Sequence, residues 1–560
     1  MRLINTRTLK LEQYFGENIP PYAILSHTWG VHEGDEVTYQ DWQNLQLASR
    51  IKGYTKILYA CRQAQDKRLD YLWVDTNCID KTSSAELTEA INSMFQWYRD
   101  AEVCFAYMAD VSHRENETDA DIQKEFLQSR WFTRGWTLQE LLAPRQIKFF
   151  FNDWSKLGSR QTLAKPISQA TGIKEHYLNG ASLEDATIAT RMSWLSRRQT
   201  TRVEDMAYCM LGIFDINMPL LYGEGMKAFI RLQEEIMKVS NDHTLFCWNW
   251  RQEFVPQNWG SMIAPHPATF QFADHLVRQE SSLDPVTSYQ MTNVGLRISF
   301  RKISTVSYHF ASLNVIDKKH RLSVGIPLYR VYNESNIYAR LPYPTCPLPL
   351  DFNPSDPLEE VYIQSKNPGV YYPLQDRHNV LVTFSNLSYN QVAIETFPNG
   401  LFNKNKGILE LIEDEWSDIF DGNLRVSFAG NDIKRVIVYV ATMEKNGNIF
   451  LFIEFIEFID MFQWYYINNP EMLQTRRRKV LWAFHESLDQ PFHETKLSTG
   501  LVLRARISPP TRNEIDSKFW QVHIWGIDGH DIVRDNRDDG NDNVSEVSSV
   551  GAVNDDGYHG

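Results

Sequence analysis

Residues that could bind or react with a ligand gather in three short segments of the first 150 residues. The segment 26–30 (SHTWG) follows an apolar run and can offer backbone N–H groups and a hydroxyl to a phosphate. Asp75 ends a second apolar run, where a carboxylate can accept a hydrogen bond from a ribose hydroxyl. Trp136 and Glu140 are four residues apart and would share one helical face. The candidate binding residues are Ser26, His27, Trp29, Gly30, Asp75 and Trp136.

Each of these residues also has a purely structural interpretation. Glu140 could be an ordinary acid on a helix surface, or a buried partner of Arg134. Asp75 could cap the turn that follows it. Trp136 could be a core aromatic residue, and His27 could be a core or loop histidine. These alternatives stay open at the level of sequence.

The elements that would position these residues alternate between strand and helix. Helical patterns, one of them over 130–142, separate four apolar runs at about 22–27, 70–75, 102–108 and 146–151. This alternation predicts an α/β fold with a mostly parallel sheet and flanking helices. The carboxyl ends of parallel strands meet at one edge, so Glu140 is expected in the same cleft as Ser26, Trp29 and Asp75.

The rest of the chain changes character twice. We predict an α/β core over 1–151, a helical extension over 152–245 and a β-rich module over 246–527. The helical extension is expected to contain helices at 157–170, 202–214 and 225–239. The β-rich module is expected to be antiparallel. The segment 528–560 is rich in acids and poor in apolar residues, which is typical of disorder.

Composition excludes several classes of protein. The chain has 560 residues, with 57 Lys and Arg against 70 Asp and Glu, which gives a net charge of −13 and argues against nucleic-acid binding. Six dispersed cysteines indicate a reduced compartment, and their spacing predicts no metal site. The first 15 residues contain no long apolar run, so secretion is not expected. The most apolar stretch, 449–467, contains three acids, so no membrane span is predicted and a cytoplasmic location is expected.

Common catalytic and cofactor signatures are absent from the sequence. It contains no Walker A loop, no G-x-G-x-x-G, no H-E-x-x-H and no G-x-S-x-G. We therefore expect no bound cofactor.

Six long blocks of sequence resemble the fungal heterokaryon incompatibility (HET) domain. They lie between residues 22 and 225: Tyr22–Gly30 (YAILSHTWG), Tyr71–Lys81 (YLWVDTNCIDK), Ser84–Met94 (SAELTEAINSM), Ser129–Leu141 (SRWFTRGWTLQEL), Thr201–Gly212 (TRVEDMAYCMLG) and Pro219–Gly225 (PLLYGEG). The resemblance implies a fungal protein of self/non-self recognition and programmed cell death, a form of innate immunity. Its implied partners are other incompatibility proteins, and a homo-oligomer is a further expectation.

The same region is distantly similar to a Toll/interleukin-1 receptor (TIR) domain. Ala23–Ser26 falls where that family's first strand ends in a serine, and Ala85–Ile91 falls where its second helix starts. Gly135–Leu141 resembles the family's W-C-x-x-E-L block, although Thr137 stands where cysteine is usual. The resemblance implies a TIR-like fold in which Glu140 is the catalytic residue and NAD is the substrate.

Elementary chemistry is compatible with that role. Breaking the bond between nicotinamide and ribose builds positive charge on the sugar, and a nearby carboxylate stabilises that charge. The sequence thus predicts an effector that cleaves NAD, an NAD nucleosidase. Two alternatives remain: the α/β region could act only by assembly, without catalysis, or the β-rich module could be a sensor that restrains the effector.

Overall fold

Four parallel strands form the centre of the N-terminal sheet. They are β3 (Ala23–His27), β4 (Tyr71–Trp73), β5 (Val103–Tyr107) and β6 (Ile147–Phe150), which pair in the order β4-β3-β5-β6. The predicted α/β fold with four parallel strands is confirmed. All five residues of β3 are buried, as expected for a central strand that is covered on both faces.

Three short strands extend this sheet at its edges and were not predicted. β1 (Arg2–Asn5) pairs antiparallel with both β2 (Leu11–Gln13) and β4, and β7 (Lys156–Ser159) pairs antiparallel with β6. The complete order is β2-β1-β4-β3-β5-β6-β7, so the sheet is mixed. Strands of three or four residues are too short to show a clear alternation of apolar and polar residues.

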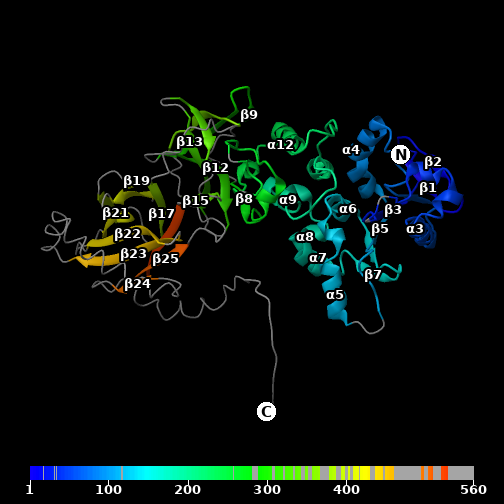
Figure 1. Cartoon of the computed structure of the whole chain (residues 1–560), viewed down its shortest axis with the longest axis horizontal. Coiled ribbons are helices and arrows are strands. Elements are labelled where there is room, and N and C mark those ends of the chain that lie inside the picture. The colour runs from blue at the N-terminus through cyan, green and yellow to red at the C-terminus, as the bar shows by residue number, and fades with distance from the viewer. Residues whose placement is uncertain are drawn as a thin grey trace, which may run out of the picture. The chain divides into compact units, whose positions relative to one another are not determined.

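Helices connect the parallel strands and cover the sheet. α3 (Tyr54–Asp66) joins β3 to β4, α4 (Ser84–Asp100) joins β4 to β5, and α5 (Asp119–Leu127) and α6 (Thr137–Leu142) precede β6. Figure 1 shows α3 and α4 on opposite sides of β3 and β5. The chain passes from β3 to β4 on one side and then returns to β5 on the other, so the topological switch point lies between β3 and β5. Two single-turn helices, α1 (Tyr39–Trp42) and α2 (Leu45–Ala48), lie between β3 and α3.

The continuous helix predicted over 130–142 is wrong. The segment forms a 3₁₀ turn, η1 (Arg130–Thr133), and then α6, with extended backbone between them. At this break the Gly135 N–H donates to the carbonyl of Gln199 at 2.8 Å. A side chain at this position would clash, because an added Cβ would lie 2.5 Å from Thr200 Cγ2. Contact with a distant segment therefore overrides the local helical pattern.

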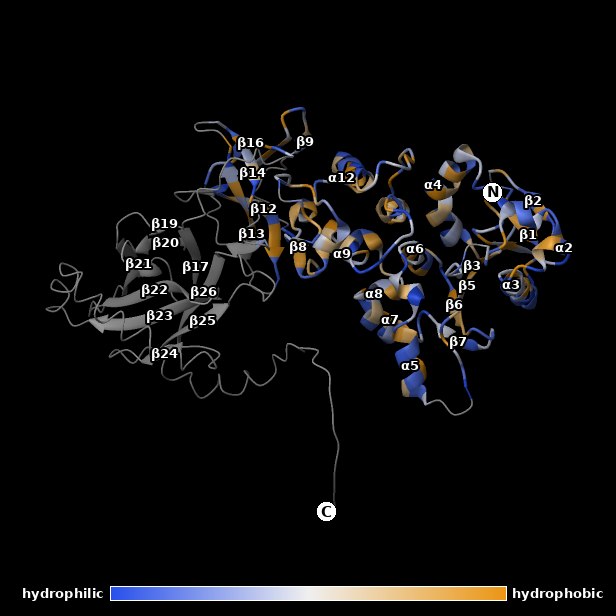
Figure 2. Cartoon of the chain, viewed as in Figure 1, coloured by the Kyte–Doolittle hydropathy of each residue, from blue (hydrophilic) through white to orange (hydrophobic). Residues whose placement is uncertain are grey.

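The helical extension follows the predicted pattern in part. The helix predicted over 157–170 starts later, because a turn at 153–155 first returns the chain alongside β6 as β7. The segment 202–214 forms two short helices instead of one. Figure 2 shows both hydrophobic and hydrophilic residues on α12, and its buried residues Phe229, Leu232 and Ile236 recur at helical spacing. The helices here are α7 (Ala164–Thr171), α8 (Glu175–Leu178), η2 (Leu183–Asp185), α9 (Ile188–Ser193), α10 (Asp205–Tyr208), α11 (Leu211–Phe214), α12 (Lys227–Val239), η3 (His243–Phe246) and η4 (Pro267–Phe270).

Two further sheets confirm the predicted β-rich character of the later sequence. The nine-stranded sheet contains β8 (Leu276–Arg278), β9 (Gln290–Met291), β10 (Leu296–Phe300), β11 (Lys302–Ser304), β12 (His309–Asp317), β13 (Leu322–Arg330), β14 (Ile337–Arg340), β15 (Leu348–Leu350) and β16 (Glu359–Ile363). The ten-stranded sheet contains β17 (Arg377–Ser385), β18 (Val392–Phe397), β19 (Phe402–Asn403), β20 (Ile408–Asp414), β21 (Ser417–Phe428), β22 (Arg435–Lys445), β23 (Asn448–Phe458), β24 (His493–Lys496), β25 (Val502–Ser508) and β26 (Phe519–Ile527). Pairing is antiparallel apart from the parallel pairs β14–β16 and β17–β26.

The chain divides into two compact units, Met1–Tyr371 and Tyr372–Gly560. The computed structural model describes residues 1–365 except 17, 31, 33, 115–117, 252, 257, 280–287, 305–308, 319–321, 332–334, 342–346 and 351–355, and beyond 365 it describes the strands β17 to β26. The predicted acidic segment 528–560 lies outside these residues. Within them, no helix is both long and apolar enough to cross a membrane.

Candidate functional site

Glu140 lies buried on α6 and faces the end of β3. Its side chain accepts a hydrogen bond from Ser26 Oγ, which lies 2.5 Å from Glu140 Oε2. The same Ser26 oxygen accepts a hydrogen bond from the indole N–H of Trp131 at 2.9 Å. The Tyr98 hydroxyl donates to the Leu25 carbonyl at 3.2 Å and also interacts with Glu140. The strand end, α4 and the η1–α6 segment thus meet at this carboxyl group.

A second cluster of polar side chains surrounds Asp75, which follows the end of β4. Asp75 Oδ1 lies 3.1 Å from His27 Nε2, and Asp75 Oδ2 accepts a hydrogen bond from the Trp29 indole N–H at 2.9 Å. The Lys81 ammonium lies 3.8 Å from Asp75 Oδ2 and 3.7 Å from the centre of a Trp29 ring. A carboxylate, an ammonium and an indole therefore form one compact cluster at the carboxyl ends of β3 and β4.

The two carboxyl groups have opposite electrostatic character. Burial raises the pKa of Glu140 to about 8, and the negative charge of Asp75 adds to this effect, although the Ser26 hydrogen bond opposes it. Burial alone would also raise the pKa of Asp75, but Lys81, His27 and the Trp29 N–H together hold that pKa well below its usual range. At neutral pH, Glu140 is therefore mostly protonated and Asp75 is ionised. Environments that separate two carboxyl pKa values in this way are typical of acid–base pairs in active sites.

Two of the predicted binding residues are engaged elsewhere. The Trp136 indole N–H donates to Asp205 Oδ2 at 3.1 Å, so its polar edge is directed to α10. The Gly30 N–H, expected to contact a phosphate, donates at 2.7 Å to a carboxylate oxygen of Glu36. That oxygen also lies 2.5 Å from Lys56 Nζ. The Glu36 carboxylate thus accepts the hydrogen bond that the Gly30 N–H was expected to offer to a phosphate.

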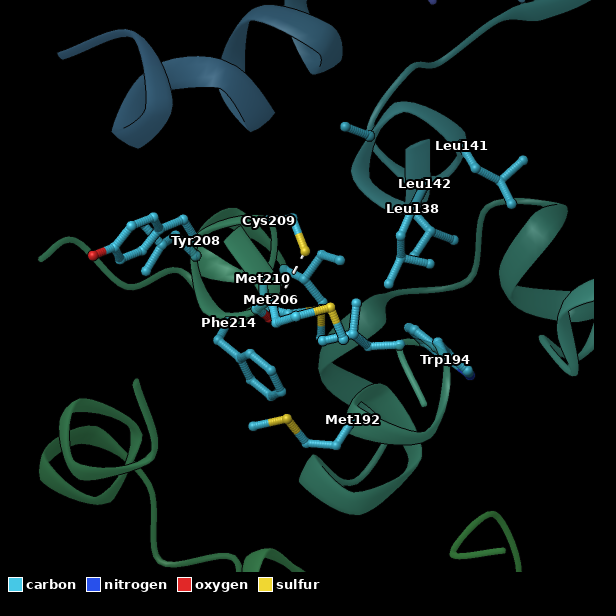
Figure 3. Packing of buried hydrophobic residues seen from close by; sticks show 14 of the residues in the cluster. Leu138, Leu141, Leu142, Met192, Trp194, Met206, Tyr208, Cys209, Met210 and Phe214 are labelled. Atoms are coloured by element: carbon cyan, nitrogen blue, oxygen red, sulfur yellow. Dashed lines mark hydrogen bonds between the residues drawn. The ribbon is translucent and has the colours of Figure 1, made fainter. Parts of the chain in front are cut away.

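The helical extension fixes the position of α6. The buried Arg198 donates to the Arg134 carbonyl at 2.8 Å and to Thr137 Oγ1 at 2.9 Å. Burial lowers the pKa of Arg198 to about 10. Figure 3 shows the apolar side chains of α6 in one cluster with side chains from α9, α10 and α11. The cluster contains Leu138, Leu141, Leu142, Met192, Trp194, Met206, Tyr208, Cys209, Met210 and Phe214.

Several residues of the site were not recognised from the sequence. Lys81 is not among the residues that the sequence singles out, but its ammonium lies next to Asp75. Tyr98 of α4 is likewise not singled out by the sequence, although it contacts both Leu25 and Glu140. No local pattern identifies Arg198, because its contacts are about 60 residues away in the sequence. Among the described residues, no cluster of His, Cys, Asp or Glu is arranged to hold a metal ion.

Residues 22–124 match the family model described as "Heterokaryon incompatibility protein (HET)". The Vegetative incompatibility protein HET-E-1 of Podospora anserina is 49% identical over 223 residues, or 39% of this chain. The aligned part spans only 16% of the length of that relative. A crystal structure of a mutated lectin XCL from Xerocomus chrysenteron matches 27% of this chain and 97% of the lectin, with 12% identity and a TM-score of 0.19. The family match includes Ser26 and Asp75 but ends before Glu140.

Proposed function

Residues 22–124 match the HET family model, and from this premise we propose that the chain acts in heterokaryon incompatibility as a cell-death effector. We further propose that its α/β region cleaves NAD between nicotinamide and ribose, as the TIR resemblance implies. A relative whose name records vegetative incompatibility supports the first part. The second part rests on the carboxyl group of Glu140.

The observation that carries the proposal is the contact between Glu140 and Ser26 at the carboxyl edge of the parallel sheet. Ligands of open α/β sheets bind at this edge. Glu140 is the proposed catalytic residue, since its carboxylate would face the anomeric carbon. Ser26 is a positioning residue: its hydroxyl donates to Glu140 and is itself oriented by the Trp131 N–H.

The raised pKa of Glu140 is compatible with this chemistry because NAD is itself cationic at the nicotinamide ring. A positive charge close to a carboxyl group lowers its pKa, so substrate binding favours the ionised form of Glu140. The carboxylate is then in place when the bond to nicotinamide breaks and positive charge moves onto the ribose. Nicotinamide leaves as a neutral molecule with the bonding electrons, and water completes the reaction at the sugar.

Asp75 and its neighbours are the proposed binding residues for the ribose. The Asp75 carboxylate is partly accessible, with 23% of its side chain exposed, and it is ionised. The Lys81 ammonium lies 3.8 Å from Asp75 Oδ2, which is too far for a hydrogen bond. A ribose hydroxyl can therefore donate to the Asp75 carboxylate at this position. His27 contacts Asp75 Oδ1 and the Trp29 indole donates to Asp75 Oδ2, and together they hold the carboxylate in place.

The test is nicotinamide release from NAD by the purified full-length chain. Glu140→Gln keeps the shape of the side chain but removes its charge, and it should lower turnover by about 10²–10³-fold. Glu89→Gln, on an exposed part of α4, is the matched control and should leave turnover unchanged. Expression in a fungal host should deplete NAD and arrest growth only when Glu140 is present.

Full activity of Glu140→Gln would refute the catalytic assignment. A wild-type chain that releases no nicotinamide would refute NAD cleavage and leave assembly as the function of the α/β region.

A further inference from the structure

A pocket lies next to the proposed catalytic group and is not explained by it. It has a volume of about 370 Å³, which is within the range of small-molecule sites. Its walls include Thr28–Gly30 after β3, together with Tyr107, Ala109 and Asp110 at the end of β5 and residues of α3. The pocket thus lies at the switch point between β3 and β5, where open α/β sheets bind nucleotides. Glu140 does not line it.

One wall of the pocket is a stack of three aromatic rings. The Trp154 ring lies 5.0 Å from that of Tyr107 and 6.2 Å from that of Tyr59, with interplanar angles of 25° and 20°. The outer ring, Tyr59, is 39% exposed. Nearly parallel aromatic rings with one exposed member are suited to stacking against a flat heterocycle.

The backbone conformation of Trp154 is strained, which is a further indication that this wall belongs to a ligand-binding site. Trp154 has a φ of +66°, a left-handed conformation that is unfavourable for a bulky side chain. A tight turn holds it there: the Trp154 N–H donates to the Phe151 carbonyl at 3.0 Å, and Asp153 accepts from the Ser155 N–H at 2.8 Å. Such strain tends to persist at ligand-binding sites.

Arg130 supplies positive charge to the wall of the pocket. It lines the pocket, and its guanidinium donates to the Trp29 carbonyl at 3.1 Å. Trp29 lines the pocket as well, and its indole donates to Asp75. No carboxylate of the described residues forms an ion pair with Arg130. The planar guanidinium therefore keeps N–H groups that can donate hydrogen bonds to a phosphate.

The pocket and Glu140 are close enough to be spanned by one dinucleotide. Glu140 is hydrogen-bonded to Ser26. The part of the pocket wall that follows β3 consists of Thr28, Trp29 and Gly30. At about 3.3 Å per residue, Ser26 and Gly30 are separated by no more than about 13 Å.

We propose that this pocket binds the adenine end of NAD. Adenine stacks against the Tyr59–Trp154–Tyr107 wall, the pyrophosphate passes Arg130, and the nicotinamide riboside reaches Glu140 and Asp75. This inference rests on the proposed NAD-cleaving function, and it names the group that selects the dinucleotide.

The test compares NAD with nicotinamide mononucleotide, which carries the same scissile bond but no adenylate. Tyr59→Ala should lower the ratio of kcat/KM for NAD to kcat/KM for the mononucleotide about tenfold, mainly by raising KM for NAD. Phe15→Ala removes an aromatic ring that is 69% exposed and lies outside the pocket, so it should leave the ratio unchanged.

The outcomes separate this inference from the proposed function. If Tyr59→Ala cleaves NAD with the wild-type ratio, the pocket is not the adenine subsite, while NAD cleavage stands. If the wild-type chain cleaves neither compound, the proposed function fails and calorimetric titration with AMP decides on the pocket. AMP binding that Tyr59→Ala abolishes would support a nucleotide site there, and a lack of AMP binding to the wild type would overturn it.

Discussion

The ionisation of a single carboxyl group, that of Glu140, is expected to control the pH dependence of the proposed site. Its burial and its nearness to Asp75 raise its pKa to about 8. The proposed chemistry needs the ionised form, whereas the free protein at neutral pH holds mostly the protonated form. The activity and the stability of the protein should therefore respond to pH in opposite directions.

The first prediction concerns activity. Between pH 6 and 8, kcat/KM for NAD should rise by up to tenfold per pH unit, and it should level off above about pH 8, because kcat/KM follows ionisation in the free enzyme. Initial rates of nicotinamide release at low NAD concentration measure this profile. A profile that is flat or falls between pH 6 and 8 would contradict a role for the Glu140 carboxylate.

The second prediction concerns stability. The folded state binds the Glu140 proton more tightly than the unfolded state, whose reference pKa is 4.5. The stabilisation from this proton is complete below about pH 4.5 and is lost as the pH rises through about 8. Glu140→Gln cannot ionise, so its Tm should exceed that of the wild type at pH 9 and approach it at pH 5. Calorimetry across this range, with Glu89→Gln as control, measures the difference. An equal Tm difference at both pH values would show that Glu140 is not the group responsible.

At the scale of elements, the central strands could be predicted and the η1–α6 segment could not. Fully buried parallel strands such as β3 appear in the sequence as short apolar runs, and strand ends place Ser26 and Asp75 at one edge without further information. The break at Gly135 depends on contact with Gln199 and Thr200, which no local pattern reveals. For the same reason Asp205, the partner of Trp136, could not be predicted.

The third prediction tests how α6 is held. Gly135→Ala places a methyl group 2.5 Å from Thr200 Cγ2 and 3.2 Å from Cys209 Sγ, so either α6 or these side chains of the extension must shift. We expect a loss of about 1–3 kcal/mol in the free energy of unfolding, measured by urea denaturation, together with slower nicotinamide release. Adding Thr200→Ser removes the nearer of the two atoms and should restore part of both. If the double variant is no better than the single one, the close approach at Gly135 is not what positions α6.

At the scale of the molecule, the helical extension and the nine-stranded sheet belong to one folding unit. Gln233 on α12 exchanges two hydrogen bonds with the backbone of Ala264, at 2.8 and 3.0 Å. The buried Arg340 of β14 donates to the carbonyls of Phe246 and Trp248 at 2.9 and 2.6 Å. The predicted domain boundary at 245 would cut through these contacts, whereas the division at 371 leaves them intact.

The fourth prediction follows from these contacts. A chain that ends at residue 371 should unfold in one cooperative transition, measured by calorimetry. A chain that ends at residue 245 exposes the apolar face of α12 and leaves Gln233 without its partner, so it should melt at a lower temperature or aggregate. Equal melting temperatures for the two truncated chains would refute the assignment of residues 246–371 to the folding unit of the α/β region.

The dependence of α6 on the helical extension also has a consequence during protein synthesis. A ribosome makes the chain from the N-terminus at about 5–20 residues per second, so the residues from Arg198 to Phe214 that hold α6 are added on the order of 4–14 s after α6 itself. During that interval the nascent chain already contains Ser26, Asp75 and Glu140 but lacks the cluster that fixes Glu140 in place. The proposed effector is therefore expected to be inactive until these residues have been made, and a chain whose translation stops before residue 198 is expected to stay inactive.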